Sequence, residues 1–189
     1  MRIISGSSKG KKLIMSYDKT TRPLKDMAKE SIFNILTHAD YIKFDLKDCE
    51  VLDLFSGIGS FGLECISRGS KFVFFLENYP PVLEILKNNI SNLKYENKSK
   101  VINFDAFKIN NNLFQKDQKF QIIFCDPPYK EKKIYLLIKN IIEMDILEEE
   151  GIIIIHRKKG ELDKYPKKFK VIDTKSYGLS TFIFGKKSI

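Results

Sequence analysis

The chain has 189 residues, a formal net charge of +9 at pH 7, 43% hydrophobic and 30% charged residues. These values exclude a wholly disordered chain and fit one globular unit that is large enough to bury a core. The positive charge favours a polyanionic partner such as a nucleic acid, although an AT-rich genome would raise the lysine content without one.

Three cysteines, Cys49, Cys65 and Cys125, are odd in number and have no C-x-x-C spacing. They indicate neither a disulfide framework nor a zinc site, so we expect no metal. No segment has the pattern of a signal peptide or the length of a membrane span. We therefore expect a cytoplasmic protein with no membrane partner, and nothing in the sequence demands more than a monomer.

The first 30 residues hold eight basic and three acidic residues, which places a net +5 in this short segment. Within residues 1–19, two short apolar pieces are separated by glycine and serine, which predicts a hairpin or an extended arm. Lysines beside such an arm would lie along a phosphate backbone, and the alternative is a solvated terminal loop. Thr20-Thr21-Arg22-Pro23 then predicts a helix start, with apolar residues at helical spacing to residue 36 or 37.

From residue 50 the pattern alternates between strands and helices, and the strands are apolar enough to be buried on both faces. A closing antiparallel hairpin is predicted around the turn signal Ser176-Tyr177-Gly178. The fold class is therefore α/β, doubly wound and Rossmann-like, with residues 49–189 as the main domain and 1–48 as a basic extension. The predicted strands are 51–55, 72–76, 101–104, 122–125, 152–155, 168–173 and 181–184. Three further helices are predicted. One ends near residue 68, and the other two span 81–93 and 132–144.

The first strand ends at Asp53, and the turn after it matches G-x-G-x-x-G at Gly57, Gly59 and Gly62. The motif alone is weak evidence, and the carboxylate of Asp53 would repel the pyrophosphate of a dinucleotide. It would suit a cation such as the ammonium of S-adenosylmethionine (SAM), directly or through water. A cofactor turn is favoured over a tight strand-to-helix connection without a ligand.

Acidic residues also end the next two predicted strands. Glu77 could accept both ribose hydroxyls of a bound nucleoside, and Asp105, followed by Ala106, could accept an adenine amino group. Each alone would be an ordinary solvated acid at a strand end. Because parallel strands present their carboxyl ends at one edge of the sheet, the three acids together predict a ligand site there.

The fourth strand runs into Asp126-Pro127-Pro128-Tyr129. The two prolines fix φ and restrict the residue before them, which predicts a stiff, extended turn. The Asp126 carboxylate and the Pro127 carbonyl could accept both hydrogens of an exocyclic amine, and Tyr129 could stack on its ring. Catalysis would then consist of positioning and electrostatics, with the methyl group supplied by the cofactor.

Taken together, these motifs resemble the RsmD-type bacterial 16S ribosomal RNA (guanine-N2) methyltransferases over nearly the whole chain. Asp-Pro-Pro-Tyr marks amino-nitrogen methyltransferases in general, whereas the N-terminal block is specific to this branch. The matching pieces are Arg2-Ile3-Ile4-Ser5-Gly6, Lys9-Gly10-Lys11-Lys12-Leu13, Arg22-Pro23, Asp26, Glu30, Phe33-Asn34, Leu52-Asp53-Leu54-Phe55-Ser56-Gly57-Ile58-Gly59, Gly62-Leu63-Glu64, Ser67-Arg68-Gly69, Glu77, Asn88-Asn89, Asp105-Ala106 and Asp126-Pro127-Pro128-Tyr129.

The resemblance implies a SAM-dependent methyltransferase fold with a mostly parallel seven-stranded sheet. It implies methyl transfer to the N2 amine of a guanine in 16S rRNA, with S-adenosylhomocysteine as the product, in a 30S subunit or an assembly intermediate. Its implied catalytic residues are Asp126, Pro127, Pro128 and Tyr129; its cofactor residues are Asp53, Phe55, Ser56, Gly57, Gly59, Glu77, Asp105 and Ala106; its RNA contacts are Arg2, Lys9, Lys11, Lys12, Arg22 and Lys29.

Some residues depart from the family pattern. Leu24 and Met27 replace a usual threonine and arginine, and His156-Arg157 follow the fifth strand where the family has a glutamate. A strand-end histidine bonded to a neighbour is the simplest interpretation of His156. Two other functions remain open, namely methylation of another amine such as adenine N6 in DNA, and a non-catalytic RNA-binding module.

Overall fold

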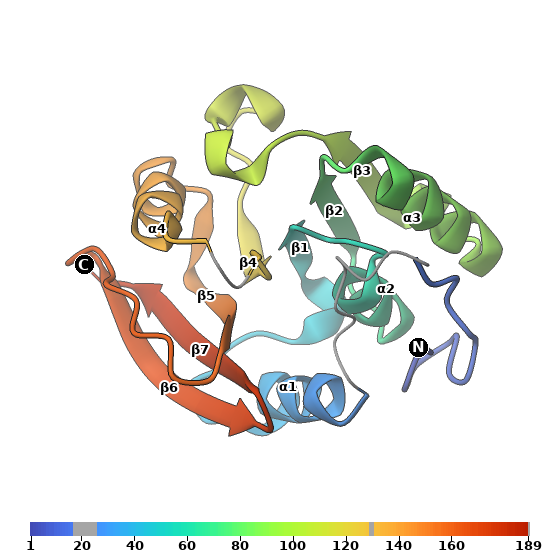
Figure 1. Cartoon of the computed structure of the whole chain (residues 1–189), viewed down its shortest axis with the longest axis horizontal. Helices are drawn as coiled ribbons and strands as arrows, with labels where there is room; N and C mark the ends of the chain where they lie inside the picture. The colour runs from blue at the N-terminus through green and yellow to red at the C-terminus, as the bar shows by residue number, and fades with distance from the viewer. Residues whose placement is uncertain (17–25, 129–130, 189) are drawn as a thin grey trace.

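The computed structural model describes residues 1–16, 26–128 and 131–188, and within them one seven-stranded sheet with the order β3-β2-β1-β4-β5-β7-β6 (Figure 1). Strands β3, β2, β1, β4 and β5 are parallel, and β7 pairs antiparallel with both β5 and β6. The strands are β1 (Glu50–Leu54), β2 (Phe72–Glu77), β3 (Ser99–Asn103), β4 (Phe120–Cys125), β5 (Leu147–Lys158), β6 (Phe169–Tyr177) and β7 (Ser180–Lys187). This arrangement confirms the predicted α/β class with a closing antiparallel hairpin.

Four α-helices and four 3-10 helices connect the described strands. The α-helices are α1 (Asp26–His38), α2 (Ser60–Ser67), α3 (Pro80–Leu93) and α4 (Ile134–Glu143). The 3-10 helices are η1 (Leu46–Asp48), η2 (Glu96–Lys98), η3 (Ala106–Lys108) and η4 (Asn111–Leu113). The predicted start of the first helix at residues 20–23 lies outside the described residues. None of the described helices is long and apolar enough to cross a membrane.

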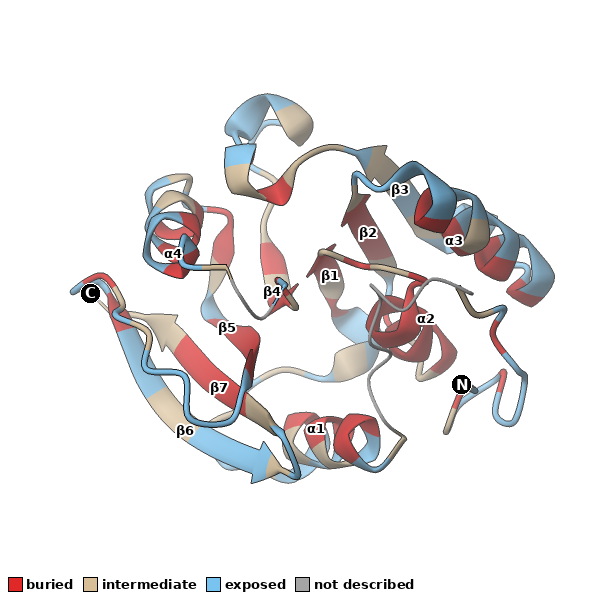
Figure 2. Ribbon diagram, viewed as in Figure 1, coloured by how far each residue is buried: buried red, intermediate tan, exposed pale blue. Residues whose placement is uncertain are grey.

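The core has two parts, one on each face of the sheet, because successive strand residues point to opposite faces. Val51 and Phe124 belong to the face covered by α1, α2 and α3, whereas Leu52 and Ile123 belong to the face covered by α4. The central strands are buried almost throughout, as Figure 2 shows. Both faces are apolar, which explains why the strands appear in the sequence as continuous hydrophobic runs.

The N-terminal arm, residues 1–16, is a folded part of the molecule. Its two halves meet at an antiparallel bridge between Arg2 and Lys12, which confirms the predicted hairpin. Ile3 and Leu13 are buried in the core cluster that contains α1, α2 and α3. Sharing this core joins the extension closely to the sheet, and the boundary at residue 48 stays a prediction.

Hydrogen bonds fix the N-terminal arm to two helices of the main domain. The hydroxyl of Ser67 in α2 donates to the carbonyl of Ser5 at 2.6 Å and accepts from the amide of Ser8 at 3.0 Å. In α3, the side-chain amide of Asn89 accepts from the backbone amide of Ile14 at 2.7 Å and donates to the carbonyl of Ile58 at 3.0 Å. Asn89 therefore connects the arm to the turn between β1 and α2.

A buried charged group, which we term the Glu64 cluster, joins the arm, α1 and α2. It consists of Glu64, Lys29, Arg68 and the backbone amides of Ile4 and Ser5. The carboxylate of Glu64, fully buried, accepts from these two amides at 2.8 and 2.9 Å. It also pairs with the Lys29 ammonium at 3.3 Å and with Arg68 Nε at 2.8 Å. Every group in the cluster thus has a partner, as buried charges require.

The Glu64 cluster corrects one prediction made from the sequence. Lys29 was predicted to contact RNA from the polar side of α1, but its side chain is 0% exposed. Its ammonium donates to the carbonyl of Arg2 at 2.8 Å in addition to pairing with Glu64. Burial lowers the pKa of Lys29, and the charge of Glu64 offsets part of that effect. The prediction for Lys29 is wrong because its ammonium is buried in an ion pair with the Glu64 carboxylate of α2.

Replacing Glu64 by Gln should lower the free energy of unfolding by about 3–5 kcal/mol, because Lys29 then stays buried without an opposite charge. Urea unfolding followed by circular dichroism measures this loss. Glu84→Gln on the exposed side of α3 is the matched control and should change stability by less than about 0.5 kcal/mol. Equal losses in the two variants would contradict the structural role of the Glu64 cluster.

Candidate active site

The carboxyl ends of β1, β2 and β4 lie side by side at one edge of the sheet. In the strand register Leu54 is level with Leu76 on one side and with Cys125 on the other. Backbone hydrogen bonds continue this alignment beyond the strands, since the amide of Ser56 donates to Leu76 at 3.0 Å and that of Asp126 to Leu54 at 3.3 Å. The residues that follow the three strands are therefore brought together.

The turn after β1 has an unusual backbone. Phe55 adopts a positive φ of 60°, which is uncommon for a residue with a side chain. Its ring packs against that of Phe107 with centroids 4.8 Å apart, and the Ser56 hydroxyl donates to the carbonyl of Leu76 at 3.0 Å. Contacts on both sides thus hold the turn in place.

The glycines of this turn have different reasons to be glycine. Gly57 has a φ of 55°, and a Cβ built on it would meet nothing within 4 Å, so the space above it is open. A Cβ on Gly62 would lie 2.3 Å from the Phe75 ring, because α2 packs closely on β2. The first glycine thus leaves room for a ligand to approach the backbone, and the third serves helix–sheet packing.

Glu77, at the end of β2, holds the turn after β1 through its carboxylate. Its Oε2 accepts from the amide of Gly57 at 2.8 Å, while Oε1 accepts from the amides of Asn78 and Tyr79 at 2.8 and 2.9 Å. Glu77 therefore lies directly beside the glycine turn, as the position of a ribose-binding acid requires.

The sequence predicts that Asp53 meets a cofactor cation directly or through water, and the structure shows its carboxylate buried against α2. The residue is 1% exposed, and its Oδ2 accepts from the amide of Gly62 in the first turn of α2 at 3.0 Å. Burial raises the pKa of its carboxyl well above the ordinary value of 3.8; the Gly62 amide opposes this, and the charges of Asp126 and Glu77 add to it. Asp53 could thus reach a cofactor only through the turn or a water molecule.

Asp105 follows β3 and caps the short helix η3. Its Oδ1 accepts from the amide of Phe107 at 3.0 Å, and Ala106 beside it is buried. The amide of Phe104 donates to the carbonyl of Glu77 at 3.3 Å, which keeps the ends of β2 and β3 together. The predicted acids near the ends of β1 and β2 and just after β3 consequently lie along one edge of the sheet.

Asp126 follows β4, and its carboxylate is bound by a histidine from the neighbouring strand. Oδ1 of Asp126 lies 2.8 Å from Nδ1 of His156, and the Asp126 side chain remains 24% exposed. Pro127 is buried and Pro128 is exposed. Tyr129 lies outside the described residues. The Asp126 turn thus presents a partly exposed carboxylate at the same edge as the glycine turn after β1.

Arg157, next to His156, connects the Asp126 turn to the loop between β5 and β6. Its Nε donates to Asp163 at 2.7 Å, and its Nη2 donates to the carbonyl of Glu131 at 2.9 Å. The side chain is buried, which a guanidinium tolerates when it is paired. Arg157 thus links Glu131 to Asp163.

The predicted RNA contacts on the N-terminal arm lie at the surface. Lys9, Lys11 and Lys12 are exposed, and Arg2 is exposed with its Nε 3.2 Å from Asp26. Arg22 lies outside the described residues. Apart from Lys29, the described residues of this set are therefore accessible to a polyanion.

The sequence singled out neither Ser180 nor the bond between His156 and Asp126. Ser180 lies 2.8 Å from Nε2 of His156 because β7 pairs antiparallel with β5. Residues that far apart in sequence meet only through strand register. The one available signal was His156 itself, one of two histidines in the chain and placed directly after a run of isoleucines.

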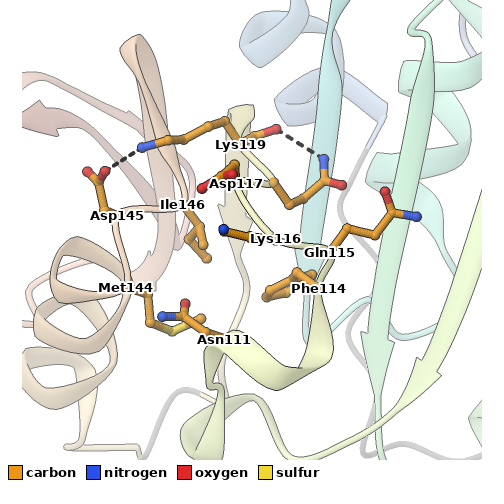
Figure 3. Close-up of a pocket in the computed structure, with 10 residues that line it drawn as sticks. Asn111, Phe114, Gln115, Lys116, Asp117, Lys119, Met144, Asp145 and Ile146 are labelled. Carbon is orange, nitrogen blue, oxygen red and sulfur yellow. Dashed lines mark hydrogen bonds and ion pairs between the residues drawn. The ribbon is translucent and has the colours of Figure 1, made fainter.

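A cavity of about 320 Å³ lies elsewhere, between the loop before β4 and the start of β5 (Figure 3). Figure 3 shows Lys119 pointing toward Asp145 above Ile146. Phe120 begins β4 and Cys125 ends it, so this cavity lies at the opposite end of the strand from Asp126. None of the predicted site residues that the structure describes lines it. Among the residues that the structure describes, no cluster of side chains could hold a metal ion.

The comparison with known proteins identifies the family. The model of the family described as Conserved hypothetical protein 95 matches residues 1–186. The chain belongs to this family. The resemblance to the RsmD-type rRNA methyltransferases, inferred above from the motifs, is thereby confirmed at the level of the family.

Named proteins also match over most or all of the chain. The chain is 35% identical over 188 residues to the "Putative rRNA methyltransferase YlbH" of Bacillus subtilis, with 99% of each covered. It is 31% identical over 183 residues to the "Ribosomal RNA small subunit methyltransferase D" of Haemophilus influenzae, with 96% and 91% covered. The solved structure of yhhF from Escherichia coli superimposes with a TM-score of 0.82 at 25% identity, covering 100% of this chain and 98% of the other.

Asp53→Asn should stabilise the protein in a pH-dependent way. Because the folded-state pKa of Asp53 is raised, its contribution to stability is complete below 3.8 and is lost as the pH rises through the raised pKa. Asparagine keeps an oxygen for the Gly62 amide and cannot ionise. The melting temperature of the variant should therefore exceed that of the wild type by a margin that grows between pH 4 and pH 8.

Melting curves over this pH range measure the margin, and Asp48→Asn, on an exposed aspartate, is the control. A margin for Asp53→Asn that does not depend on pH would show that the buried carboxyl does not titrate as described.

Proposed function

We propose that the chain transfers a methyl group from SAM to the exocyclic N2 amine of a guanine in 16S rRNA, within a 30S subunit or an assembly intermediate. Family membership supports the broader activity, rRNA methylation. The observation that carries the proposal is the meeting of a glycine turn, Glu77 and Asp126 at the carboxyl ends of three adjacent strands.

The residues beside the glycine turn fit a bound SAM molecule. The space above Gly57 is open, so a ligand can approach the backbone there. Glu77 stands next to that backbone and is suited to ribose hydroxyls, and Asp105 with Ala106 is suited to an adenine. Asp53 would support this site indirectly, because its carboxylate binds the amide of Gly62 and so fixes the first turn of α2. When bound, SAM supplies a methyl group activated by its sulfonium.

The Asp126 turn would hold the amine that receives the methyl group. The lone pair of a guanine N2 amine is delocalised into the ring, which makes the amine a poor nucleophile. Acceptance of its two hydrogens by Asp126 and by the Pro127 carbonyl would favour a pyramidal nitrogen with its lone pair free. The nitrogen would then take the methyl group that SAM supplies, and the proton that it loses would pass to Asp126 or to water.

The guanine would have to leave its stack to reach Asp126, as base-modifying enzymes generally require. Stacking on Tyr129 would compensate part of that cost, by about 1–3 kcal/mol. The exposed lysines of the N-terminal arm would bind the RNA backbone, where contacts are sequence-independent and sensitive to salt. The arm packs directly on α2 and α3, so its lysines are fixed relative to the cofactor turn.

Incubation with methyl-labelled SAM and 30S particles that lack the modification tests the proposal directly. The expected result is label in 16S rRNA, recovered as N2-methylguanosine after digestion. Label in DNA as N6-methyladenine, with none in rRNA, would replace the proposed substrate. SAM binding without any transfer would instead identify a non-catalytic RNA-binding module.

Asp126→Ala should lower the rate of methyl transfer by about 100-fold or more, because the amine loses its charged acceptor. Its affinity for SAM, measured by isothermal titration calorimetry, should stay within about threefold of the wild type. A comparable loss of SAM affinity would assign Asp126 to the cofactor site rather than to the amine.

Joint replacement of Lys9, Lys11 and Lys12 by alanine should flatten the salt dependence of RNA binding. Each lost phosphate contact lowers the slope of log K against log salt concentration by about 0.7 to 0.9. Filter binding to a 16S rRNA fragment at several salt concentrations measures the slope.

The control for the arm lysines is a triple variant with the same change in net charge. Lys47, Lys116 and Lys139 are exposed and lie outside the N-terminal arm. Their replacement by alanine should leave the slope near that of the wild type. Equal slopes for the two triple variants would remove the arm from the RNA-binding surface.

A further inference from the structure

Among the residues that the structure describes, His156 binds one oxygen of the Asp126 carboxylate. Nδ1 of His156 lies 2.8 Å from Oδ1, a normal hydrogen-bond length for a charged acceptor. His156 follows the buried run Ile152 to Ile155 on β5, and this strand is the direct neighbour of β4, which leads into Asp126. The contact is therefore a consequence of the sheet order.

The direction of this hydrogen bond follows from the groups involved. An ionised carboxylate can only accept, so Nδ1 of His156 must carry a proton and donate it to Oδ1. In a neutral imidazole the other nitrogen, Nε2, is then an acceptor, and it lies 2.8 Å from the hydroxyl of Ser180. The hydroxyl of Ser180 can donate to it, so both ring nitrogens have a partner when Nδ1 donates to Asp126.

The imidazole ring of His156 cannot turn freely. It is stacked on the ring of Phe182, with centroids 4.5 Å apart and planes 17° apart. The two residues are paired across β5 and β7, and His156 is 4% exposed. The backbone and ring packing thus fix the direction from which Nδ1 reaches the carboxylate.

We propose that His156 is the positioning residue for Asp126. Its Nδ1 binds Oδ1 of Asp126 and its Nε2 binds Ser180, and this arrangement orients the carboxylate so that Oδ2 meets the substrate amine. This inference rests on the proposed function, because it assigns a role within the same transfer reaction. A carboxylate free to rotate would present either oxygen over a range of directions. A carboxylate held at one oxygen presents the other in a single direction, which favours alignment with the methyl donor.

A pair of amide variants separates positioning from simple packing. The side-chain amide of asparagine in His156→Asn can place an N–H where Nδ1 lies, whereas that of glutamine in His156→Gln reaches the place of Nε2. The first variant keeps a donor for Asp126, and the second keeps only the contact to Ser180. Both remove the stacking on Phe182.

The expected result concerns kcat. His156→Gln should lower kcat by roughly 10-fold or more, while KM for SAM and for RNA changes little, as is typical when a supporting hydrogen bond is removed. His156→Asn should stay within about threefold of the wild-type kcat. Equal losses in both variants, or a loss expressed in KM alone, would overturn the positioning role.

Nuclear magnetic resonance of the imidazole nitrogens tests the hydrogen bond without any reaction. The chain has two histidines, and His38 is exposed at the end of α1, so His38→Gln leaves His156 as the single imidazole signal. Nδ1 of His156 should carry a proton. A proton on Nε2 alone would overturn the proposal, because Asp126 would then have no donor.

These outcomes remain distinct from failure of the proposed function. If the wild type transfers methyl to rRNA and His156→Gln does so equally fast, the positioning role is wrong and the function stands. If the wild type modifies no rRNA, the function itself is wrong, and the role assigned to His156 in that reaction is withdrawn with it.

Discussion

The arrangement of the N-terminal arm and α1 depends on the interactions of one buried carboxylate, that of Glu64. A charge inside a protein is tolerated only when its partners surround it. Here the partners come from the arm, from α1 and from α2 itself. The same helix α2 begins after the glycine turn, and Asp53 accepts a hydrogen bond from the amide of Gly62 in its first turn. Helix α2 therefore contacts the basic arm and also begins directly after the glycine turn that follows β1.

The candidate active site concentrates negative charge and backbone strain in one place. Asp53, Glu77 and Asp126 lie close enough that the latter two raise the pKa of the first. Phe55 holds a positive φ between them. Such features cost stability, and the surrounding hydrogen bonds and apolar packing offset that cost. Asp53, Glu77, Asp126 and Phe55 thus occur together at the carboxyl ends of the parallel strands.

The sequence predicted what depends on local patterns and missed what depends on tertiary contacts. Strands β2 and β4 were recognised because both of their faces are apolar. The first part of β5 was missed because Glu148, Glu149 and Glu150 interrupt that pattern, although it pairs with β4 from Leu147 onward. Lys29 has the helical position of a surface residue, and only the distant Glu64 buries it. The contact of His156 with Ser180 depends on strand register, which no motif encodes.

The N-terminal arm also limits how this chain can be shortened or recombined. Without residues 1–16, the Glu64 carboxylate would lose two amide donors, Lys29 would lose the carbonyl of Arg2, and the hydroxyl of Ser67 would lose both of its partners. Tolerance to truncation follows such buried bonds rather than position near a terminus. A fragment without the basic arm would therefore leave several buried polar groups unpaired, and a graft of this arm onto another protein would lack the contacts that it makes here.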